Sequence, residues 1–423
     1  MRRNAHLQMQ RRFRMVKRRL FILQILLILL LAGCGSTEGL NPDNDSMHTE
    51  KTEKEQWEKG YNLPVGEKEE KEAENDCKRM MDLYGSIYEA AAKGSAANVV
   101  LDDETILEIQ KVIKESGAPV AAVAPYSAME NYETVDTYLT ACAHGKQGTV
   151  VFYEVHSDGG LNRMKFIFDG TDMYVMSAKG SWRNDNSPVL SYVSYTRLLE
   201  WNYTPKGWFG YKLCVPTPEE VGEVTDGSCL VRVKPMTEQQ KKMSKRCVYG
   251  LGYQGNNLLC SNWDEEHLSS LDYNGMFEYL YAMKYGTEFN SEAHLDGIPK
   301  REFEELIMEY LPITETQLRE YAAFDEEKQT YLWERLWCFN YAPTFFGTSL
   351  PEVVNIIEKT DGIVVLTVEA VCDMVICDDA VITHELTVQF EEDGSFRYLG
   401  NTILNDGIMN IPEYQYRVHR EEQ

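Results

Sequence analysis

A basic stretch, a short apolar run and a cysteine open the chain and decide which residues are left to fold. Residues 1–19 carry eight basic side chains and no acidic one, and residues 20–32 are apolar except for Gln24. A helix that spans a membrane needs about 20 apolar residues, so this run of 13 is too short for a standing anchor. The pattern is typical of a secretory signal peptide, and we expect residues 1–33 to be removed.

The four residues Leu31-Ala32-Gly33-Cys34 resemble the lipobox of bacterial lipoproteins. This resemblance implies cleavage before Cys34 and lipidation of its thiol, and two acyl chains together give durable anchoring. We therefore expect a chain held by lipid on the extracytoplasmic face of the cell membrane. The alternative is an uncleaved short transmembrane helix. Met15 is an alternative start, because the residues from there to Cys34 have ordinary signal-peptide proportions.

The remaining chain is strongly acidic. Removal of the eight cations of residues 1–33 from the 42 Lys and Arg leaves 34 against 67 Asp and Glu, a net charge of −33. Phosphate backbones and anionic lipid surfaces repel such a chain, so nucleic-acid partners are disfavoured. An envelope protein, peptide or glycan remains as a partner, and no cofactor is indicated.

Residues 34–76 are rich in Glu and Lys and hold few apolar side chains. Such a segment buries too little apolar surface to offset its ordering entropy, so we expect a disordered tether that begins at the lipidated Cys34. A helix over residues 67–82 is the alternative. Residues 77–423 are long enough for two domains of about 100 to 200 residues each, which we place at 77–262 and 263–423.

For each of these two regions the sequence predicts helices followed by an antiparallel meander. In the first, helical spacing of apolar residues covers 77–144, and strands follow at 149–155, 164–168, 173–176, 189–203, 208–215, 229–234 and 247–262. Ser157-Asp158-Gly159-Gly160 and Asp169-Gly170 are turn signals between them.

In the second region, an apolar stripe at helical spacing predicts a helix over 299–311, and the capping-box spacing of Thr314 and Gln317 begins another. Strands follow at 352–358, 363–374, 381–390 and 395–404. The fold class is therefore α+β, and helices before a four-stranded meander suit a cone-like α+β roll of the kind found in the nuclear-transport-factor-like superfamily. This comparison concerns architecture alone and transfers no function.

Four segments, 201–211, 253–259, 299–318 and 392–401, resemble those of an uncharacterised clostridial lipoprotein family, a domain of unknown function. The resemblance spans most of residues 77–423. It implies a Gram-positive host and assigns no site residues.

Aromatic residues concentrate between residues 182 and 211. An exposed row of such rings would stack on sugar faces, whereas buried sheet core explains them more simply. As ligand-binding candidates we take Trp182, Trp201, Tyr203 and Trp208.

The remaining motifs do not indicate a nucleotide-binding or metal-binding site. Residues 250–255 satisfy G-x-G-x-x-G, but the following residues read as a returning strand, so we interpret the glycines as a hairpin or bulge. His384 lies on the apolar parity of its strand, as expected for a hydrogen-bonded core histidine. The acidic clusters lack the spacing of a calcium loop, and the histidines lack metal-ligand spacing.

Nine cysteines remain after Cys34, without a C-x-x-C motif. Cys247 and Cys260 would pair if the stretch between them were a hairpin, and buried free thiols are the alternative. Because the sequence contains no recognisable catalytic motif, our leading hypothesis is a non-enzymatic module for binding or envelope assembly. A cell-envelope hydrolase acting on glycan or peptide is the alternative, because paired carboxylates come together only in the tertiary fold.

Overall fold

The structure is a computed structural model that describes residues 60–94, 98–214, 228–336, 349–372, 380, 382–404 and 414–418. The expected signal peptide, Cys34 and the part of the expected tether up to residue 59 lie outside the described residues. Within those ranges, no helix is both long enough and apolar enough to cross a membrane. The expected α+β class with antiparallel meanders is confirmed.

The charged segment before residue 77 ends in a long helix, α3 (Glu67–Ala90). The expected tether therefore cannot extend to residue 76, and the alternative helix over 67–82 is confirmed and runs further. Ala73 and Cys77 on this helix are buried against the sheet. The fully buried guanidinium of Arg163 binds Glu72 at 2.8 Å and Asp76 at 2.9 Å, so the charges that suggested a tether dock the helix instead.

A seven-stranded sheet forms the N-terminal lobe, which we define as residues 60–236. Its strands follow chain order from one edge to the other: β1 (Val120–Ala122), β2 (Gly148–Val155), β3 (Leu161–Phe168), β4 (Met173–Trp182), β5 (Pro188–Tyr203), β6 (Trp208–Leu213) and β7 (Ser228–Arg232). β1 pairs with β2 in parallel, and the other neighbours are antiparallel. The sheet is so strongly curved that its two edges approach each other. The backbone N–H of Met129, close to β1, donates to the carbonyl of Arg232 on β7 at 3.0 Å.

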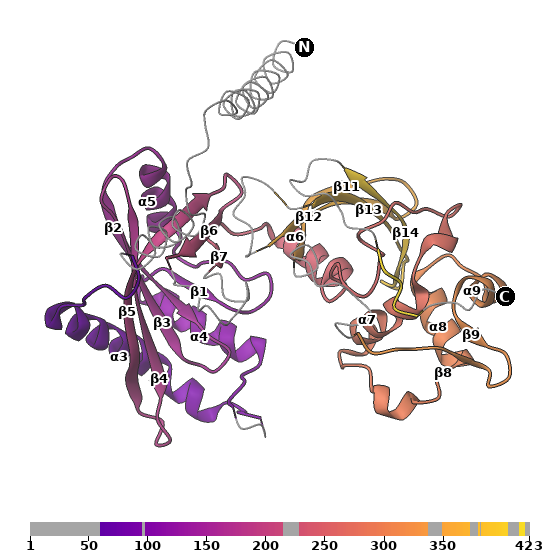
Figure 1. The fold of residues 1–423 in the computed structure, drawn as a ribbon, viewed down its shortest axis with the longest axis horizontal. Helices are drawn as coiled ribbons and strands as arrows, with labels where there is room; N and C mark the ends of the chain where they lie inside the picture. Colours follow the sequence, from indigo (N-terminus) through magenta and orange to yellow (C-terminus); the bar gives the residue numbers. More distant parts are fainter. Residues whose placement is uncertain are drawn as a thin grey trace, which may run out of the picture. The chain divides into compact units, whose positions relative to one another are not determined.

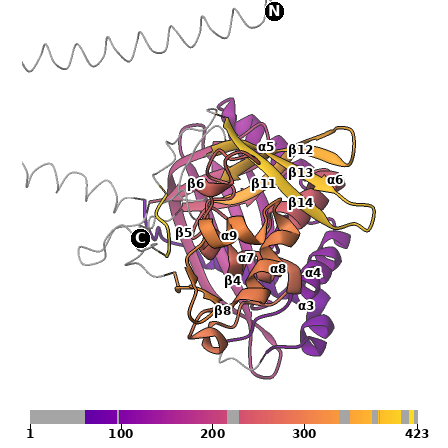
Figure 2. The same cartoon turned by 90° about the vertical axis from the view of Figure 1, so that its right-hand side faces the viewer.

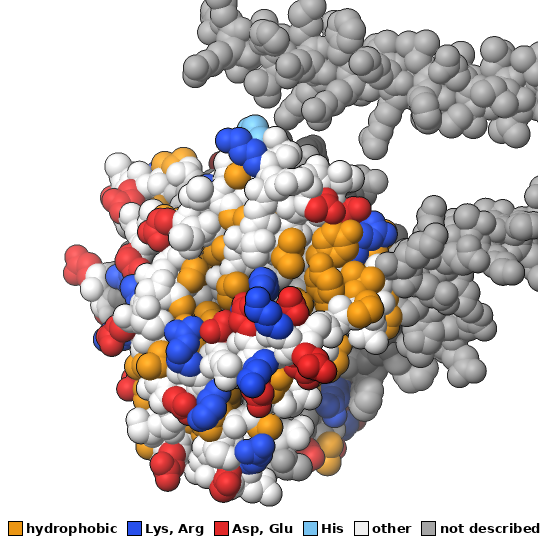
Figure 3. Space-filling model, turned by 90° about the vertical axis from the view of Figure 1, so that its left-hand side faces the viewer, with side chains coloured by type: hydrophobic (Ala, Val, Ile, Leu, Met, Phe, Trp, Pro, Cys, Tyr) orange, Lys and Arg blue, Asp and Glu red, His pale blue; other side chains and the backbone are white. Residues whose placement is uncertain are grey.

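Helices cover both faces of this sheet (Figure 1). α5 (Glu133–Ala143) packs with Phe152, Phe166 and Phe209 in a core on the inner face. α3 and α4 (Asp103–Glu115) form a second core on the outer face with Tyr153 and Leu161. Figure 3 views the side of the molecule where α3 lies, and acidic and basic side chains are interspersed over it.

The C-terminal lobe, residues 237–418, places helices against a four-stranded meander (Figure 2). The helices are α6 (Glu238–Met243), a π-helical turn (Ser244–Val248), α7 (Tyr273–Tyr285), α8 (Lys300–Tyr310) and α9 (Glu315–Tyr321). A small sheet, β8 (Ile298–Pro299), β10 (Thr330–Tyr331) and β9 (Phe324–Asp325), joins them. The meander has the order β11 (Leu350–Glu358), β12 (Ile363–Val371), β13 (Ile382–Phe390) and β14 (Phe396–Leu404).

The strand expected over residues 247–262 is wrong. The chain there forms the end of the π-helical turn and then irregular turns, with Gly250, Gly252 and Gly255 at positive φ. Side chains replace the missing strand pairing, since the amide of Asn256 donates to the carbonyl of Leu251 at 2.8 Å. No helix begins at the glycines, as a dinucleotide site would require.

The pairing considered for Cys247 and Cys260 is also wrong, because both are buried free thiols. Burial raises the pKa of each to about 12. Both side chains belong to the hydrophobic core of the C-terminal lobe. Residues 247–260 thus pack with the elements that follow them, while the domain limits at 262 and 263 stay a prediction.

Candidate functional site

A pocket of about 430 Å³ lies where the segment after β1, the end of β7 and the start of β11 meet. We call it the junction pocket. Its lining is mostly apolar and consists of Ala121, Ala122, Val123, Ala124, Pro125, Tyr126, Ser127, Ala128, Glu154, Trp208, Leu230, Val231, Arg232, Tyr249, Leu350, Glu352 and Val371. Both lobes contribute side chains, so the pocket exists only when the two are folded together.

Tyr126 forms part of the wall of this pocket in a strained backbone conformation. Its φ of +55° lies in the left-handed region, which is a rare conformation for a bulky residue and persists only where the surroundings enforce it. Its hydroxyl donates to the carbonyl of Pro351 at 2.6 Å, and its ring meets the edge of Tyr249 with centroids 5.9 Å apart. The segment after β1 is therefore fixed to the C-terminal lobe.

A buried ion pair lies in the same wall. The guanidinium of Arg232 on β7 binds the carboxylate of Glu352 on β11, and it also lies over the indole ring of Trp208 at 4.9 Å. Beside it, the Lys206 ammonium binds the Glu369 carboxylate at 2.5 Å. Two cations of the N-terminal lobe thus meet two carboxylates of the C-terminal lobe.

Burial governs the acid–base properties of this wall. Removal from water raises the pKa of the Glu352 carboxyl above its usual value, and the Arg232 guanidinium opposes that rise. Burial also raises the pKa of the Tyr126 hydroxyl. At neutral pH the phenol stays protonated and acts as a donor.

The lining favours binding over catalysis. Ser127 donates its hydroxyl to the carbonyl of Ala122 at 2.6 Å, which leaves it oriented along its own segment. Glu154 has its carboxylate near the imidazole of His156 at 3.4 Å. Apolar walls with a few fixed polar groups are typical of sites that hold a ligand.

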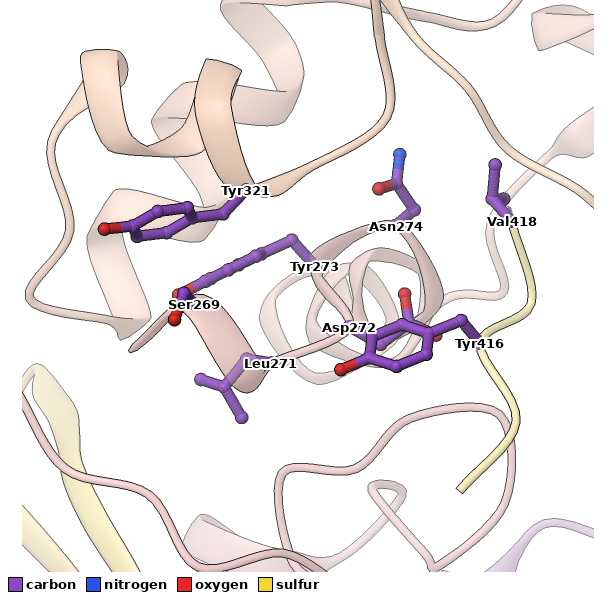
Figure 4. A pocket seen from close by; sticks show the side chains of 8 residues that line it. All are labelled: Ser269, Leu271, Asp272, Tyr273, Asn274, Tyr321, Tyr416 and Val418. Carbon is purple, nitrogen blue, oxygen red and sulfur yellow. The ribbon is translucent and has the colours of Figure 1, made fainter. Parts of the chain in front are cut away.

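A second pocket, of about 290 Å³, lies within the C-terminal lobe (Figure 4). Tyr273 and Tyr321 lie on one side of it, and Asp272 and Tyr416 on the other. The Asp272 carboxylate already accepts from the Gly275 backbone N–H at 2.8 Å and from the Tyr414 hydroxyl at 2.7 Å. The junction pocket is the better candidate of the two, because its volume of about 430 Å³ exceeds the 290 Å³ of this pocket and its lining is mostly apolar.

The four aromatic residues predicted to bind a ligand do not form one row. Trp182 stacks on Tyr88 with centroids 4.5 Å apart and donates to the Gly159 carbonyl at 2.8 Å. Trp201 packs against the core of the inner sheet face. Tyr203 packs against the same core and donates its hydroxyl to Asp136 at 2.7 Å.

Of these four residues, Trp208 is the one that lines the junction pocket. A binding role for the other three stays a prediction. Lipidation of Cys34 also stays a prediction, since Cys34 lies outside the described residues.

Sequence reasoning missed Tyr126, Leu230, Arg232 and Glu352. The charged Arg232 between apolar Val231 and Val233 was the one local signal, because a charge inside a short apolar strand needs a partner. Its partner lies 120 positions further along the chain, so no spacing rule could identify it.

His384 is confirmed as a hydrogen-bonded core histidine. It is fully buried, and its ring nitrogens lie 3.0 Å from the Tyr253 hydroxyl and 2.6 Å from the Asn401 side-chain oxygen. Among the residues that the structure describes, no group of three or more His, Cys, Asp or Glu is arranged to hold a metal ion.

Comparison with known proteins gives a family without an assigned activity. Residues 70–417 match a family of unknown function (DUF6070). Neither the curated proteins nor the solved structures contain a match to the chain. The likeness to a cone-like roll therefore stays a prediction.

Proposed function

Because the chain belongs to a family of unknown function that offers no activity to transfer, we propose from its own residues that it is a lipid-anchored extracytoplasmic binding protein. In this proposal Cys34 carries the lipid and the junction pocket holds a ligand of the cell envelope. The observation that supports binding is a mostly apolar pocket of about 430 Å³ with a buried ion pair fixed in its wall. Such a wall presents a rigid shape, which lowers the entropy lost on binding.

The anchor is tested by replacement of Cys34. The variant Cys34→Ala removes the thiol that would carry the lipid, so the protein should leave the membrane fraction and appear in the medium or the soluble fraction. Mass spectrometry of the wild-type protein should find residues 1–33 absent and Cys34 carrying fatty chains. An intact N-terminal leader or an unmodified Cys34 would overturn the anchoring proposal.

The pocket is tested by filling it. Val123 lines the pocket and is 43% exposed, so Val123→Trp adds bulk there without disturbing a buried side chain. Affinity capture from the native envelope should then lose the components bound by the wild-type protein. Val100→Trp is the matched control, because Val100 is 59% exposed and lies outside the pocket lining. Equal capture by both variants and the wild type would contradict the proposal.

An envelope hydrolase is the second candidate, favoured by one observation: the carboxylates of Glu154 and Glu352 both line the junction pocket. The Glu352 carboxylate is bound to Arg232, which ties it to a structural role. Turnover of envelope glycan or peptide that disappears in Glu154→Gln, with capture unchanged, would establish the hydrolase in place of the binding protein.

A further inference from the structure

The outer edge of β7 borders the junction pocket, and the backbone geometry shows which residues point along it. The Thr204 N–H donates to the Trp208 carbonyl at 2.8 Å, so the backbone groups of Trp208 face β5. In an antiparallel ladder this direction alternates from one residue to the next. The N–H and C=O groups of Phe209 therefore point toward β7, and those of its partner Val231 point toward β6.

By the same alternation, the N–H and C=O groups of Leu230 and Arg232 point away from β6. The Arg232 carbonyl confirms this direction, since it accepts from the Met129 N–H at 3.0 Å. Leu230 has no such partner among the described residues, and its side chain lines the pocket. Leu230 thus has one backbone donor and one backbone acceptor open at the pocket edge.

The other strand edges that reach the pocket already use most of their outward backbone groups. On β11, Pro351 has no N–H, its carbonyl accepts from Tyr126, and the Val353 N–H donates to the Ser244 hydroxyl at 2.9 Å. Next to β1, Val120 exchanges both of its backbone hydrogen bonds with Glu130. On β7, by contrast, Leu230 has both its N–H and its C=O without a partner among the described residues, so this edge suits a further strand.

We propose that the junction pocket takes an extended peptide of another protein, which pairs with β7 at Leu230 and places an apolar side chain in the pocket. This rests on the proposed binding function and names its ligand class. A peptide backbone offers a donor and an acceptor at the spacing of a strand edge, which is the mode of β-strand addition. Tyr249, 45% exposed at the pocket wall, provides apolar contact for the side chain.

Charge specifies the peptide further. The charges of Arg232 and Glu352 neutralise each other, so Glu154 gives the pocket lining a net negative charge. The whole chain is also acidic, with a formal net charge of −25 before any cleavage. A peptide with a basic residue beside its apolar anchor fits this field and is steered toward it.

The test uses the protein purified in detergent from the membranes of its host and a phage-displayed library of random dodecapeptides. Selected peptides should share an apolar residue flanked by a basic one. Synthetic copies with single N-methyl groups should lose roughly tenfold in affinity at one position, the residue whose N–H donates to the Leu230 carbonyl, because the methyl there removes the donor and leaves its acceptor unpaired. Equal affinity of all the N-methylated copies would overturn strand addition.

Two variants at one position separate backbone pairing from side-chain packing. Leu230→Pro removes the open N–H at an edge where proline is tolerated, and it should weaken the peptide roughly tenfold or more. Leu230→Ala keeps the N–H and should weaken it less. Melting curves of both variants establish that they fold, and equal binding by the two would overturn the proposal.

The outcomes also distinguish this proposal from the proposed function. If Val123→Trp abolishes envelope capture while no peptide is selected, the binding function stands and the peptide ligand falls. If Val123→Trp changes nothing, both fall. A concentration-dependent dimer that Leu230→Pro dissolves would identify a second copy of this chain as the occupant and would overturn a peptide partner.

Discussion

His384 shows how a single buried residue sets a pH dependence. The amide nitrogen of Asn401 donates to the carbonyls of Leu259 and Ser261, so its oxygen accepts from Nδ1 of His384. Nε2 then accepts from the Tyr253 hydroxyl, and the ring is neutral. Burial is the main reason that the pKa of His384 falls from 6.5 to about 4.

We predict that stability falls as pH drops from 6.5 toward 4. In that window the unfolded histidine is protonated while the folded one is not, so the unfolded state binds more protons and gains stability as pH decreases. The full loss is about 3 kcal/mol. Urea unfolding at several pH values should show this slope in the wild-type protein.

The slope should be reduced in His384→Gln, which cannot titrate. His144→Gln is the control, because this imidazole is exposed and bonds the Thr140 backbone carbonyl at 2.7 Å rather than a carboxylate. If His384→Gln keeps the wild-type slope, the assignment to His384 is wrong.

At the scale of elements, α3 is attached to its sheet through Arg163. The guanidinium is 1% exposed, whereas its partners Glu72 and Asp76 are 46% and 25% exposed. Loss of the carboxylates would leave a charge buried without a partner, while loss of the arginine would leave carboxylates that water can reach. The two sides of this ion pair are therefore unequal.

We predict that the double variant Glu72→Ala with Asp76→Ala lowers the free energy of unfolding by roughly 3 kcal/mol, since it leaves a buried charge unpaired. Arg163→Leu should cost less. Denaturant unfolding checks both, and Glu70→Ala with Glu74→Ala removes the same charge from exposed positions of α3 as a control. A larger loss in Arg163→Leu than in the double variant would contradict this account.

The elements that the sequence predicted well are those with local signals. The meander β11–β14 follows from alternating apolar residues and from Asp361-Gly362 and Asp393-Gly394 at its turns. Residues 247–262 failed because glycines and apolar residues also suit a hairpin, whereas here asparagine side chains hold an irregular loop inside the core. The predicted end of the tether at residue 76 was wrong because Glu72 and Asp76 bind a buried partner, Arg163, about 90 residues away in the sequence.

At the scale of the whole molecule, the two lobes are joined by the pocket wall. Glu352 is 3% exposed, and its pair with Arg232 lies beside the hydrogen bond from Tyr126 to Pro351. The sequence could not predict this site, because its lining comes from positions between 121 and 371 that no periodicity connects. It did predict β7 and most of β11, but no strand was expected at β1, which lies within the region 77–144 that was predicted to be helical.

We predict that Glu352→Ala uncouples the lobes, because it leaves Arg232 buried without its carboxylate at a cost of roughly 3 kcal/mol. Calorimetry should show one unfolding transition for residues 56–423 in the wild-type protein and two in the variant. Glu358→Ala is the control, since Glu358 is an exposed residue of the same strand. A single unshifted transition in Glu352→Ala would rule out this coupling.

The buried thiols described above allow the opening of each lobe to be followed by the rate of their alkylation. Six of the seven described cysteines are buried, and burial raises the pKa of Cys77 to about 11 and of Cys247 to about 12. Because the thiolate is the species that alkylating reagents attack, these sulfurs react only when their surroundings open. Alkylation of Cys77 therefore times the detachment of α3, and alkylation of Cys247 times the opening of the C-terminal lobe, without any label having to be engineered.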